Sequence, residues 1–424
     1  MKENIYEAVK NTDKRKGLVL GGGGAKGCYE IGALQAFKEC GITFDCVSGT
    51  SIGAIVGAIY ACGKEDNLVD FVMDLEPSDI VENLVITTDP KELFKNRENL
   101  LKVAEHYGKS KGVDITPLKN VFNNMFNYDD FMNSNIDFSC MTFNVSQYKP
   151  IPWFKGKGIN ENNVNDVVIA SASCFPAFPM QKIEDDLYID GGYDDNLPVD
   201  LAIDMDAQVI VAIDVKGVGL YRPKIIKDEI CYWEPLVPLG NFLDFRAKEG
   251  MRSMKLGYLE TMKRLDQLPG YIYTFEKEDF RKMIDFENFM SVYAEKHEIS
   301  VDKKMKKHFM GHDVPDLRSK YTRIFLYEIL LEYLASSVHM KATEIYRFDD
   351  FCKEVLSRLE EKKETPVSLL KLSKVIEDRF FEVLHILYNG AGNKIPIRLR
   401  NIDFIEDYLG VVTVWKGLEE FYKK

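Results

Sequence analysis

The amino-acid sequence predicts an α/β domain with a largely parallel central sheet, followed by an appended helical C-terminal region. Between about Gly17 and Gly217, short apolar runs alternate with helical patterns, which is typical of a layered α/β domain. Two glycine-rich turns each join an apolar run to a helical pattern. From about Phe280 the pattern is helical and strongly charged. We therefore expect one domain at residues 15–280 and a helical region at residues 281–424.

The strands are expected where apolar runs are rich in β-branched residues and end at glycine or a charged turn. Three runs meet this description, at residues 18–20, 44–48 and 208–215. Residues 138–148, followed by residues 150–154, are more typical of a hairpin. Between the first two strands, apolar residues recur every third position from Ile31 to Cys40, and Gly41 follows. This spacing predicts a helix that crosses back over the sheet.

Two later segments complete the expected organisation. The stretch from Tyr221 to Gly240 contains Pro223, Pro235 and Pro238, so we expect an irregular, partly apolar connector. It either packs on the core or lies over a lipid site. Further on, the pair Thr365-Pro366 is typical of a helix start, and the helical pattern that follows stops at Asn389-Gly390.

Composition narrows the classes of function. The net charge of -12 disfavours nucleic acid as a partner and strong attraction to anionic lipid surfaces. The eight cysteines are scattered without a C-x-x-C pair, which favours reduced thiols. The N-terminus carries charged residues before any apolar run, so we expect a cytoplasmic protein. The longest nearly apolar stretch, residues 49–63, is shorter than the roughly 20 residues of a transmembrane helix. Any membrane contact is therefore expected to be peripheral.

The first motif is a glycine-rich loop at residues 21–27, between the first strand and the first helix. Glycine allows successive backbone amides to converge on an anion near a helix N-terminus. The spacing Gly22-x-Gly24-x-x-Gly27 also fits a dinucleotide-binding loop, with Asp45 as the residue that would bind a ribose hydroxyl. A nucleoside-triphosphate loop fits less well, because Cys28 stands where that motif requires lysine. An anion-binding loop and a dinucleotide-binding loop both remain open at this stage.

The second motif is Gly49-Thr50-Ser51-Ile52-Gly53, between the second strand and a helix of small residues. This is the strand-turn-helix context that a nucleophile elbow requires. Gly49 and Gly53 relieve crowding at the turn, so that the Ser51 hydroxyl is held above the sheet edge. We therefore take Ser51 as the candidate nucleophile.

A serine nucleophile needs a base, and no histidine is an obvious one. Five of the six histidines lie beyond the α/β region, in helical or highly charged segments; the sixth is His106. His308 and His312 are four residues apart, but without an H-E-x-x-H arrangement we expect a solvated helix there rather than a metal site. The carboxylate alternative is Asp190-Gly191-Gly192, which on its own is an ordinary Asp-Gly turn.

The ordered set of motifs resembles the patatin-like phospholipases. Gly22-Gly23-Gly24-Ala25-Lys26-Gly27, then Gly49-Thr50-Ser51-Ile52-Gly53, then Asp190-Gly191-Gly192 look like the three signatures of that family. Residues 170–176, with Ser171 and Ser173, resemble the family's serine-rich turn. The resemblance covers roughly residues 15–217, and the helical remainder past about Phe280 matches no family feature.

The resemblance implies a three-layer α/β/α fold with a Ser-Asp dyad and no catalytic histidine, metal or other cofactor. Ser51 would attack an ester carbonyl and Asp190 would act as the base. The amides of Gly22, Gly23 and Gly24 would bind the oxyanion. Lys26 matches the basic position of the first motif without an assigned catalytic step. Gly27, Gly49, Gly53, Gly191 and Gly192 would support the motifs.

The expected function is therefore hydrolysis of a carboxylic ester in a lipid, with phospholipids or lysophospholipids as substrates. Two alternatives remain open from the residues alone. One is a nucleotide-dependent oxidoreductase that uses the glycine loop for a pyrophosphate. The other is a non-catalytic interaction protein that acts through its helical C-terminal region.

Overall fold

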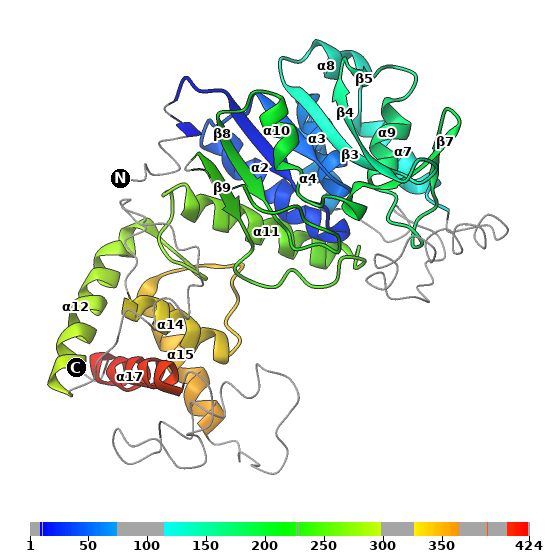
Figure 1. The fold of residues 1–424 in the computed structure, drawn as a ribbon. Coiled ribbons are helices and arrows are strands. Elements are labelled where there is room, and N and C mark those ends of the chain that lie inside the picture. Colours follow the sequence, from blue (N-terminus) through cyan, green and yellow to red (C-terminus); the bar gives the residue numbers. More distant parts are fainter. Residues whose placement is uncertain are drawn as a thin grey trace. The chain divides into compact units, whose positions relative to one another are not determined.

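The computed structural model describes residues 9–10, 12–73, 114–225, 227, 229–297, 326–363, 388 and 405–422. The chain forms two compact units, Met1–Thr261 and Met262–Lys424 (Figure 1). The division falls inside helix α11 (Ala247–Arg264), earlier than the boundary after residue 280 that the sequence suggested. Residue 280 is where the long helix α12 begins, and this helix is what the sequence pattern detects.

The first unit is built on a mixed, mostly parallel sheet of nine strands. Seven strands follow the order β5-β4-β3-β2-β1-β8-β9, and β7 pairs with both β3 and β6. The pairs β1-β2, β1-β8, β2-β3 and β8-β9 are parallel, whereas β3 pairs antiparallel with β4 and β7. The strands are β1 (Lys16–Leu20), β2 (Cys46–Gly49), β3 (Asp137–Asn144), β4 (Lys149–Lys155), β5 (Gly158–Ile159), β6 (Gln181–Ile183), β7 (Asp186–Asp190), β8 (Val209–Ile213) and β9 (Ile230–Trp233).

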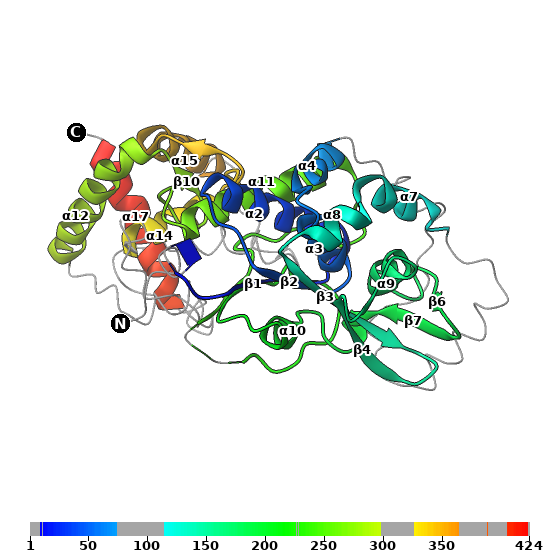
Figure 2. The same cartoon turned by 90° about the horizontal axis from the view of Figure 1, so that it is seen from above.

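Helices cover both faces of this sheet, which confirms the expected layered α/β/α fold. Figure 2 shows α2 and α3 on one face and α10 on the other. The α10 face packs Leu197 and Val199 against Val19 of β1 and Ile210 of β8. The helices of the unit are α2 (Cys28–Glu39), α3 (Ile52–Ala61), α4 (Glu65–Met73), α7 (Thr116–Met125), α8 (Tyr128–Asn133), α9 (Val164–Ser171), α10 (Val199–Asp204) and α11.

The three predicted strands and the hairpin are confirmed as β1, β2, β8 and the antiparallel pair β3-β4. The predicted crossing helix is α2, and Gly41 follows it with a φ of 68°. Runs of apolar residues mark these strands because the centre of the sheet is covered on both faces. Leu18, Val19 and Leu20 of β1 are all fully buried.

The prediction of an irregular connector at residues 221–240 is wrong in part, because β9 lies within it. This short strand adds to the edge of the sheet, with Ile213 of β8 opposite Trp233. Trp233 is 2% exposed and its ring stacks on that of Phe37, with 5.4 Å between the centroids. The proline-rich flanks concealed a strand that pairs with β8 and packs on α2 through Trp233.

The strand β3 brings the two halves of the first unit together at one edge of the sheet. Gly49, the last residue of β2, is paired with Cys140. Asp190, the last residue of β7, is paired with Thr142. The two positions on β3 are two residues apart, which corresponds to about 7 Å along a strand. Segments that are distant in the sequence therefore end side by side.

The second unit is mainly helical, which confirms the helical C-terminal region. Its aromatic core includes Phe275, Phe286, Phe348 and Phe351, all fully buried. Its elements are the short parallel pair β10 (Thr274–Phe275) and β11 (Ile345–Tyr346), with helices α12 (Phe280–Lys296), α14 (Leu326–Ser337), α15 (Phe348–Lys363) and α17 (Ile405–Tyr422). The helix expected between Thr365 and Asn389 falls outside the described residues, apart from residue 388.

Within the described ranges, none of the helices combines the length and apolar character needed to cross a bilayer.

Candidate active site

Ser51 lies in the turn between β2 and α3, in the arrangement expected of a nucleophile elbow. Its backbone has a φ of 59° and a ψ of -128°, a combination that a residue with a side chain rarely adopts. The side chain is 9% exposed. The turn places Ser51 at the N-terminus of α3, where the helix dipole favours negative charge.

Two glycines make this turn sterically allowed. A Cβ on Gly49 would lie 2.3 Å from the carbonyl oxygen of Gly53. A Cβ on Gly53 would lie 2.4 Å from the carbonyl oxygen of Leu20. Both contacts are with backbone atoms, which cannot move aside cheaply. Glycine is therefore required at both positions by the close approach of neighbouring backbone.

Asp190 ends β7 and lies against Ser51. The amide of Gly192 donates a hydrogen bond to Asp190 Oδ1 at 2.8 Å. The Ser51 hydroxyl lies close enough to interact with the same carboxyl. Asp190 is 5% exposed, and none of the ion pairs among the described residues involves it. Within the described residues, the neighbours of this carboxyl are therefore hydrogen-bond donors and not a positively charged side chain.

Burial raises the pKa of Asp190 to about 7, and the hydrogen bonds from Ser51 and Gly192 lower it in part. Asp190 lies near Tyr193, whose ring belongs to an apolar cluster with Phe143 and Phe175. A carboxyl group with a pKa near 7 is matched to proton transfer at neutral pH.

The serine-rich segment supports the backbone of both residues. Ser171 Oγ accepts a hydrogen bond from the amide of Ser51 at 3.1 Å and donates one to the carbonyl of Met141 at 2.7 Å. The carbonyl of Ser173 accepts from the amide of Asp190 at 3.0 Å. This segment therefore holds the two turns at a constant separation.

The glycine-rich loop passes beside Ser51. A Cβ on Gly22 would lie 3.1 Å from Ser51 Cβ. The amide of Gly22 already donates to the carbonyl of Asn196 at 2.9 Å. The amides of Gly23 and Gly24 have no acceptor within the part of the chain that the structure describes. Of the three amides expected to bind an oxyanion, these two are therefore available.

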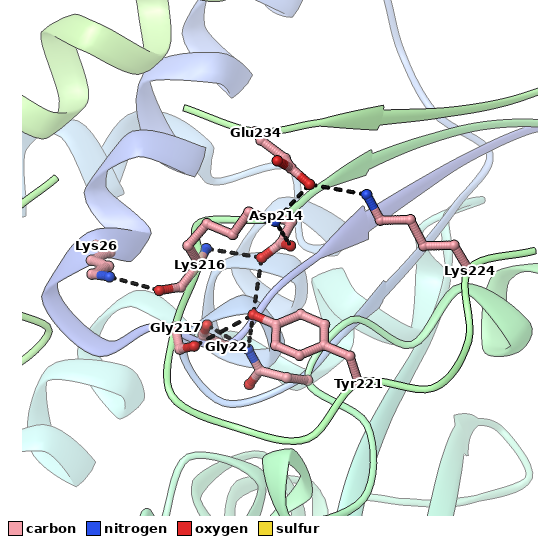
Figure 3. Close-up of polar contacts among 9 residues, drawn as sticks. Gly22, Lys26, Asp214, Lys216, Gly217, Tyr221, Lys224 and Glu234 are labelled. Atoms are coloured by element: carbon pink, nitrogen blue, oxygen red, sulfur yellow. Dashed lines mark hydrogen bonds and ion pairs between the residues drawn. The ribbon is translucent and has the colours of Figure 1, made fainter. Parts of the chain in front are cut away.

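The remaining motif residues have structural contacts. Lys26 Nζ donates to the carbonyl of Lys216 at 2.6 Å, in the loop after β8 (Figure 3). Partial burial lowers the pKa of Lys26, and the charge of Asp214 raises it in part. A Cβ on Gly27 would lie 2.4 Å from Ile52 Cγ1, and one on Gly191 would lie 2.3 Å from the carbonyl oxygen of Met141. These glycines allow close packing around the site.

The dinucleotide alternative is wrong on geometry. Asp45 precedes β2, and its Oδ2 accepts a hydrogen bond from the amide of Lys16 at 2.7 Å, at the start of β1. The glycine-rich loop follows the other end of β1. Because β1 and β2 are parallel, Asp45 and the loop lie at opposite edges of the sheet. The acidic residue that binds a ribose must lie at the same edge as the loop.

No histidine lies in the described part of the first unit. His297 and His339 belong to the second unit, and the other four histidines, including His308 and His312, fall outside the described residues. Among the described residues there is also no group of three or more His, Cys, Asp or Glu side chains arranged to hold a metal ion.

Asn196 is the residue of this site that the sequence did not single out. It is 1% exposed and binds the glycine-rich loop, with Nδ2 donating to the carbonyl of Gly22 at 2.9 Å. Asn196-Leu197-Pro198 directly precedes α10, which begins at Val199. A buried asparagine in a turn carries no sequence signal for its partner, so this role could not be found from spacing.

A pocket of about 460 Å³ is lined by the two sequence neighbours of Asn196, Asp195 and Leu197, and by the loop after β8. Figure 3 shows the polar cluster on its wall, where Lys216 pairs with Asp214 and Glu234, and Tyr221 contacts Asp214. The lining residues include Asp195, Leu197, Val199, Asp200, Asp214, Lys216, Gly217, Tyr221, Arg222, Pro223, Lys224, Ile225 and Tyr232. Its charged groups are largely paired with one another.

Comparison with known proteins identifies relatives over about two thirds of the chain. The chain is 26% identical over 300 residues to lysophospholipase nte1 of Aspergillus fumigatus, a match covering 65% of this chain and 17% of that protein. It is 28% identical over 288 residues to lysophospholipase NTE1 of Chaetomium globosum, covering 66% and 18%. The chain thus spans less than a fifth of the length of these relatives. The crystal structure of VipD from Legionella pneumophila aligns over 97% of this chain and 93% of that chain, with 14% identity and a TM-score of 0.39.

The family model of the patatin-like phospholipases matches residues 18–203, the segment that contains the glycine-rich loop, the Ser51 turn and the Asp190 turn. The resemblance to this family that the sequence predicts is therefore confirmed for residues 18–203.

Proposed function

We propose that the chain is a lipid acyl hydrolase that cleaves carboxylic esters with Ser51 as nucleophile and Asp190 as base. The observation that carries the proposal is the placement of the Ser51 hydroxyl beside a buried carboxyl, Asp190, whose pKa is raised to about 7 by burial. The family of residues 18–203 and the lysophospholipase relatives favour phospholipids or lysophospholipids as substrates.

In the proposed first step, Ser51 Oγ attacks the ester carbonyl while its proton passes to Asp190. The protonated Asp190 then returns this proton to the leaving alcohol, and an acyl-enzyme on Ser51 remains. In the second step, Asp190 takes a proton from water as the water oxygen attacks the acyl carbonyl. Asp190 then returns this proton to Ser51 Oγ as the bond between Oγ and the acyl group breaks, so that the fatty acid leaves and both side chains are restored. A base with a pKa near 7 can perform both transfers at neutral pH.

The oxyanion of each tetrahedral intermediate requires hydrogen-bond donors. The unengaged amides of Gly23 and Gly24 and the N-terminus of α3 are the groups that we assign to this task. Losing such a donor typically costs about 10² to 10³ in rate.

Peripheral contact with a membrane is part of the proposal. Leu220 and Tyr221 are 46% and 42% exposed, in the loop after β8 and at the same sheet edge as Ser51. Exposed apolar side chains at this edge support contact with a lipid surface. The expected cytoplasmic location stays a prediction.

The test compares purified wild type with Ser51→Ala on a p-nitrophenyl fatty ester and on lysophosphatidylcholine. We expect the loss of nearly all activity in Ser51→Ala. A fluorophosphonate should label the wild type, and mass spectrometry should place the label on Ser51. Ser146→Ala is the matched control, because Ser146 lies in an exposed turn, where its Oγ accepts a hydrogen bond from the amide of Leu187 at 3.0 Å.

Activity retained in Ser51→Ala, or a label on another residue, contradicts the proposal. An inactive wild type that binds no phosphonate would favour the interaction-protein alternative.

A further inference from the structure

Asn196 holds both polar groups of Gly22. Its backbone carbonyl accepts from the Gly22 amide at 2.9 Å, and its Nδ2 donates to the Gly22 carbonyl at 2.9 Å. The approach is so close that a Cβ on Gly22 would lie 2.2 Å from Asn196 Oδ1. Gly22 is therefore clamped by a single residue in the turn between Asp190 and α10.

This clamp determines the direction of the next amide. The carbonyl of Gly22 and the N-H of Gly23 belong to one planar trans peptide and point in opposite directions. When Nδ2 of Asn196 holds the carbonyl, the Gly23 N-H must point away from Asn196. The Gly23 amide is one of the two amides without an acceptor in the described part of the loop.

The side chain of Asn196 is itself held in one orientation. Nδ2 donates its second hydrogen to the hydroxyl of Tyr221 at 2.9 Å. That hydroxyl donates to Asp214 Oδ1 at 3.0 Å, as Figure 3 shows. Turning the amide over would place Oδ1 against the Gly22 carbonyl, so that two acceptors would face each other. The backbone of Asn196 is also held, because its amide donates to the carbonyl of Leu220 at 2.7 Å.

We propose that Asn196 is a positioning residue that orients the Gly22-Gly23 peptide, so that the Gly23 amide is directed at the oxyanion before substrate binds. This inference rests on the proposed function. A donor fixed in advance does not have to be reoriented during the reaction, which is the source of its effect on rate.

The test uses Asn196→Leu, which has a similar shape and no charge but cannot donate to Gly22. We expect kcat per active site to fall about 10²-fold, the typical cost of a misplaced oxyanion donor, with KM changed less than about threefold. Active sites are counted by the final extent of fluorophosphonate labelling, and the rate of labelling should fall in parallel with kcat. The pH at which kcat/KM is half-maximal should stay that of the wild type.

The matched control is Asn144→Leu, because Asn144 is also fully buried but its side chain contacts Asp186 and Gln147 rather than the loop. We expect Asn144→Leu to lower stability and the number of active sites while kcat per site stays near that of the wild type. Tyr221→Phe removes only the second partner of Nδ2, so kcat should fall about three- to tenfold, between the control and Asn196→Leu.

The inference is overturned if Asn196→Leu keeps the wild-type kcat per active site. It is also overturned if the pH profile of kcat/KM shifts in this variant, because the substitution would then act through the pKa of Asp190. If Asn196→Leu does not fold, Tyr221→Phe becomes the test of the inference. An unchanged kcat per active site in Tyr221→Phe then overturns it. Activity in Ser51→Ala would instead show that the proposed function itself is wrong.

Discussion

Two buried aspartates at the same edge of the sheet have opposite surroundings. Asp190 ends β7 beside an apolar cluster and is held by the hydroxyl of Ser51 and the amide of Gly192. Asp214 follows β8, and its Oδ2 pairs with Lys216 Nζ at 3.1 Å. Its Oδ1 also accepts from the hydroxyl of Tyr221 and from the amide of Lys216.

Under the proposed mechanism, one edge of the sheet holds both a reactive and a structural carboxylate. Asp214 lies beside the positive charge of Lys216, whereas Asp190 has no such cation among the described residues. A carboxyl buried without a cation is costly to ionise, so it exchanges its proton in the physiological range. Charge pairing, rather than depth of burial, separates the two roles.

The same substitution at both positions should give the largest contrast. We expect Asp190→Asn to lower kcat/KM at least about 10³-fold, because the base is lost. Asp214→Asn keeps the shape of the side chain and the acceptor Oδ1. It removes an ion pair with Lys216, which is half exposed, so we expect kcat/KM to fall less than about tenfold. Ester hydrolysis by the two purified variants measures this contrast. Equal losses would show that the two carboxylates do not differ in role.

The pH profile of activity gives the next effect. Because the pKa of Asp190 is raised to about 7, kcat/KM should fall about tenfold per pH unit below pH 7. Asp214→Asn should retain this profile. A half-maximal pH near 4 in the wild type would mean that the carboxyl is not desolvated as described.

Stability should depend on pH in the corresponding direction. The folded-state pKa of Asp190 lies above that of an unfolded aspartate, about 4, so folding favours the protonated form. Its contribution to stability is complete below about pH 4 and is lost as the pH rises through about 7. We therefore compare the free energy of unfolding of Asp190→Asn with that of the wild type at each pH. Between low pH and pH 8, this difference should change in favour of Asp190→Asn by up to about 4 kcal/mol. Urea unfolding at several pH values measures this, with Asp214→Asn as the variant in which the gain should be absent.

The smallest effect is expected for Lys26. Its Nζ donates to the Lys216 carbonyl, in the loop that carries Asp214, and not to the Ser51 and Asp190 pair. Lys26→Met should therefore change kcat/KM less than about tenfold and mainly lower stability, by about 1 kcal/mol. A loss as large as that of Asp190→Asn would place Lys26 in the chemistry rather than in loop order.

The sequence was most informative where local chemistry determines local structure. The turn at Ser51 was visible because Gly49 and Gly53 are required by contacts within a few residues or with the adjacent β1. The central strands were visible because burial on both faces makes their runs apolar. By contrast, β9 was hidden among prolines, because the contact of Trp233 with Phe37 is long-range.

The partnership of Ser51 with Asp190 was reached only through the family resemblance. An Asp-Gly turn has the same sequence whether or not a serine lies beside it, and the strand register that joins them is not written in either motif. Asn196 and the pairing of Asp214 with Lys216 were missed for the same reason, since each depends on a partner that is remote or unmarked in the sequence.

The pairing of β3 with both β2 and β7 limits how this domain can tolerate change in length. Residues added to the connections between these strands leave Gly49 and Asp190 opposite the same two positions of β3. Removing one residue between Cys140 and Thr142 would instead turn every later side chain of that strand to the other face. Insertions and new chain termini are therefore expected to be tolerated in the connections, whereas β3 has to retain its length.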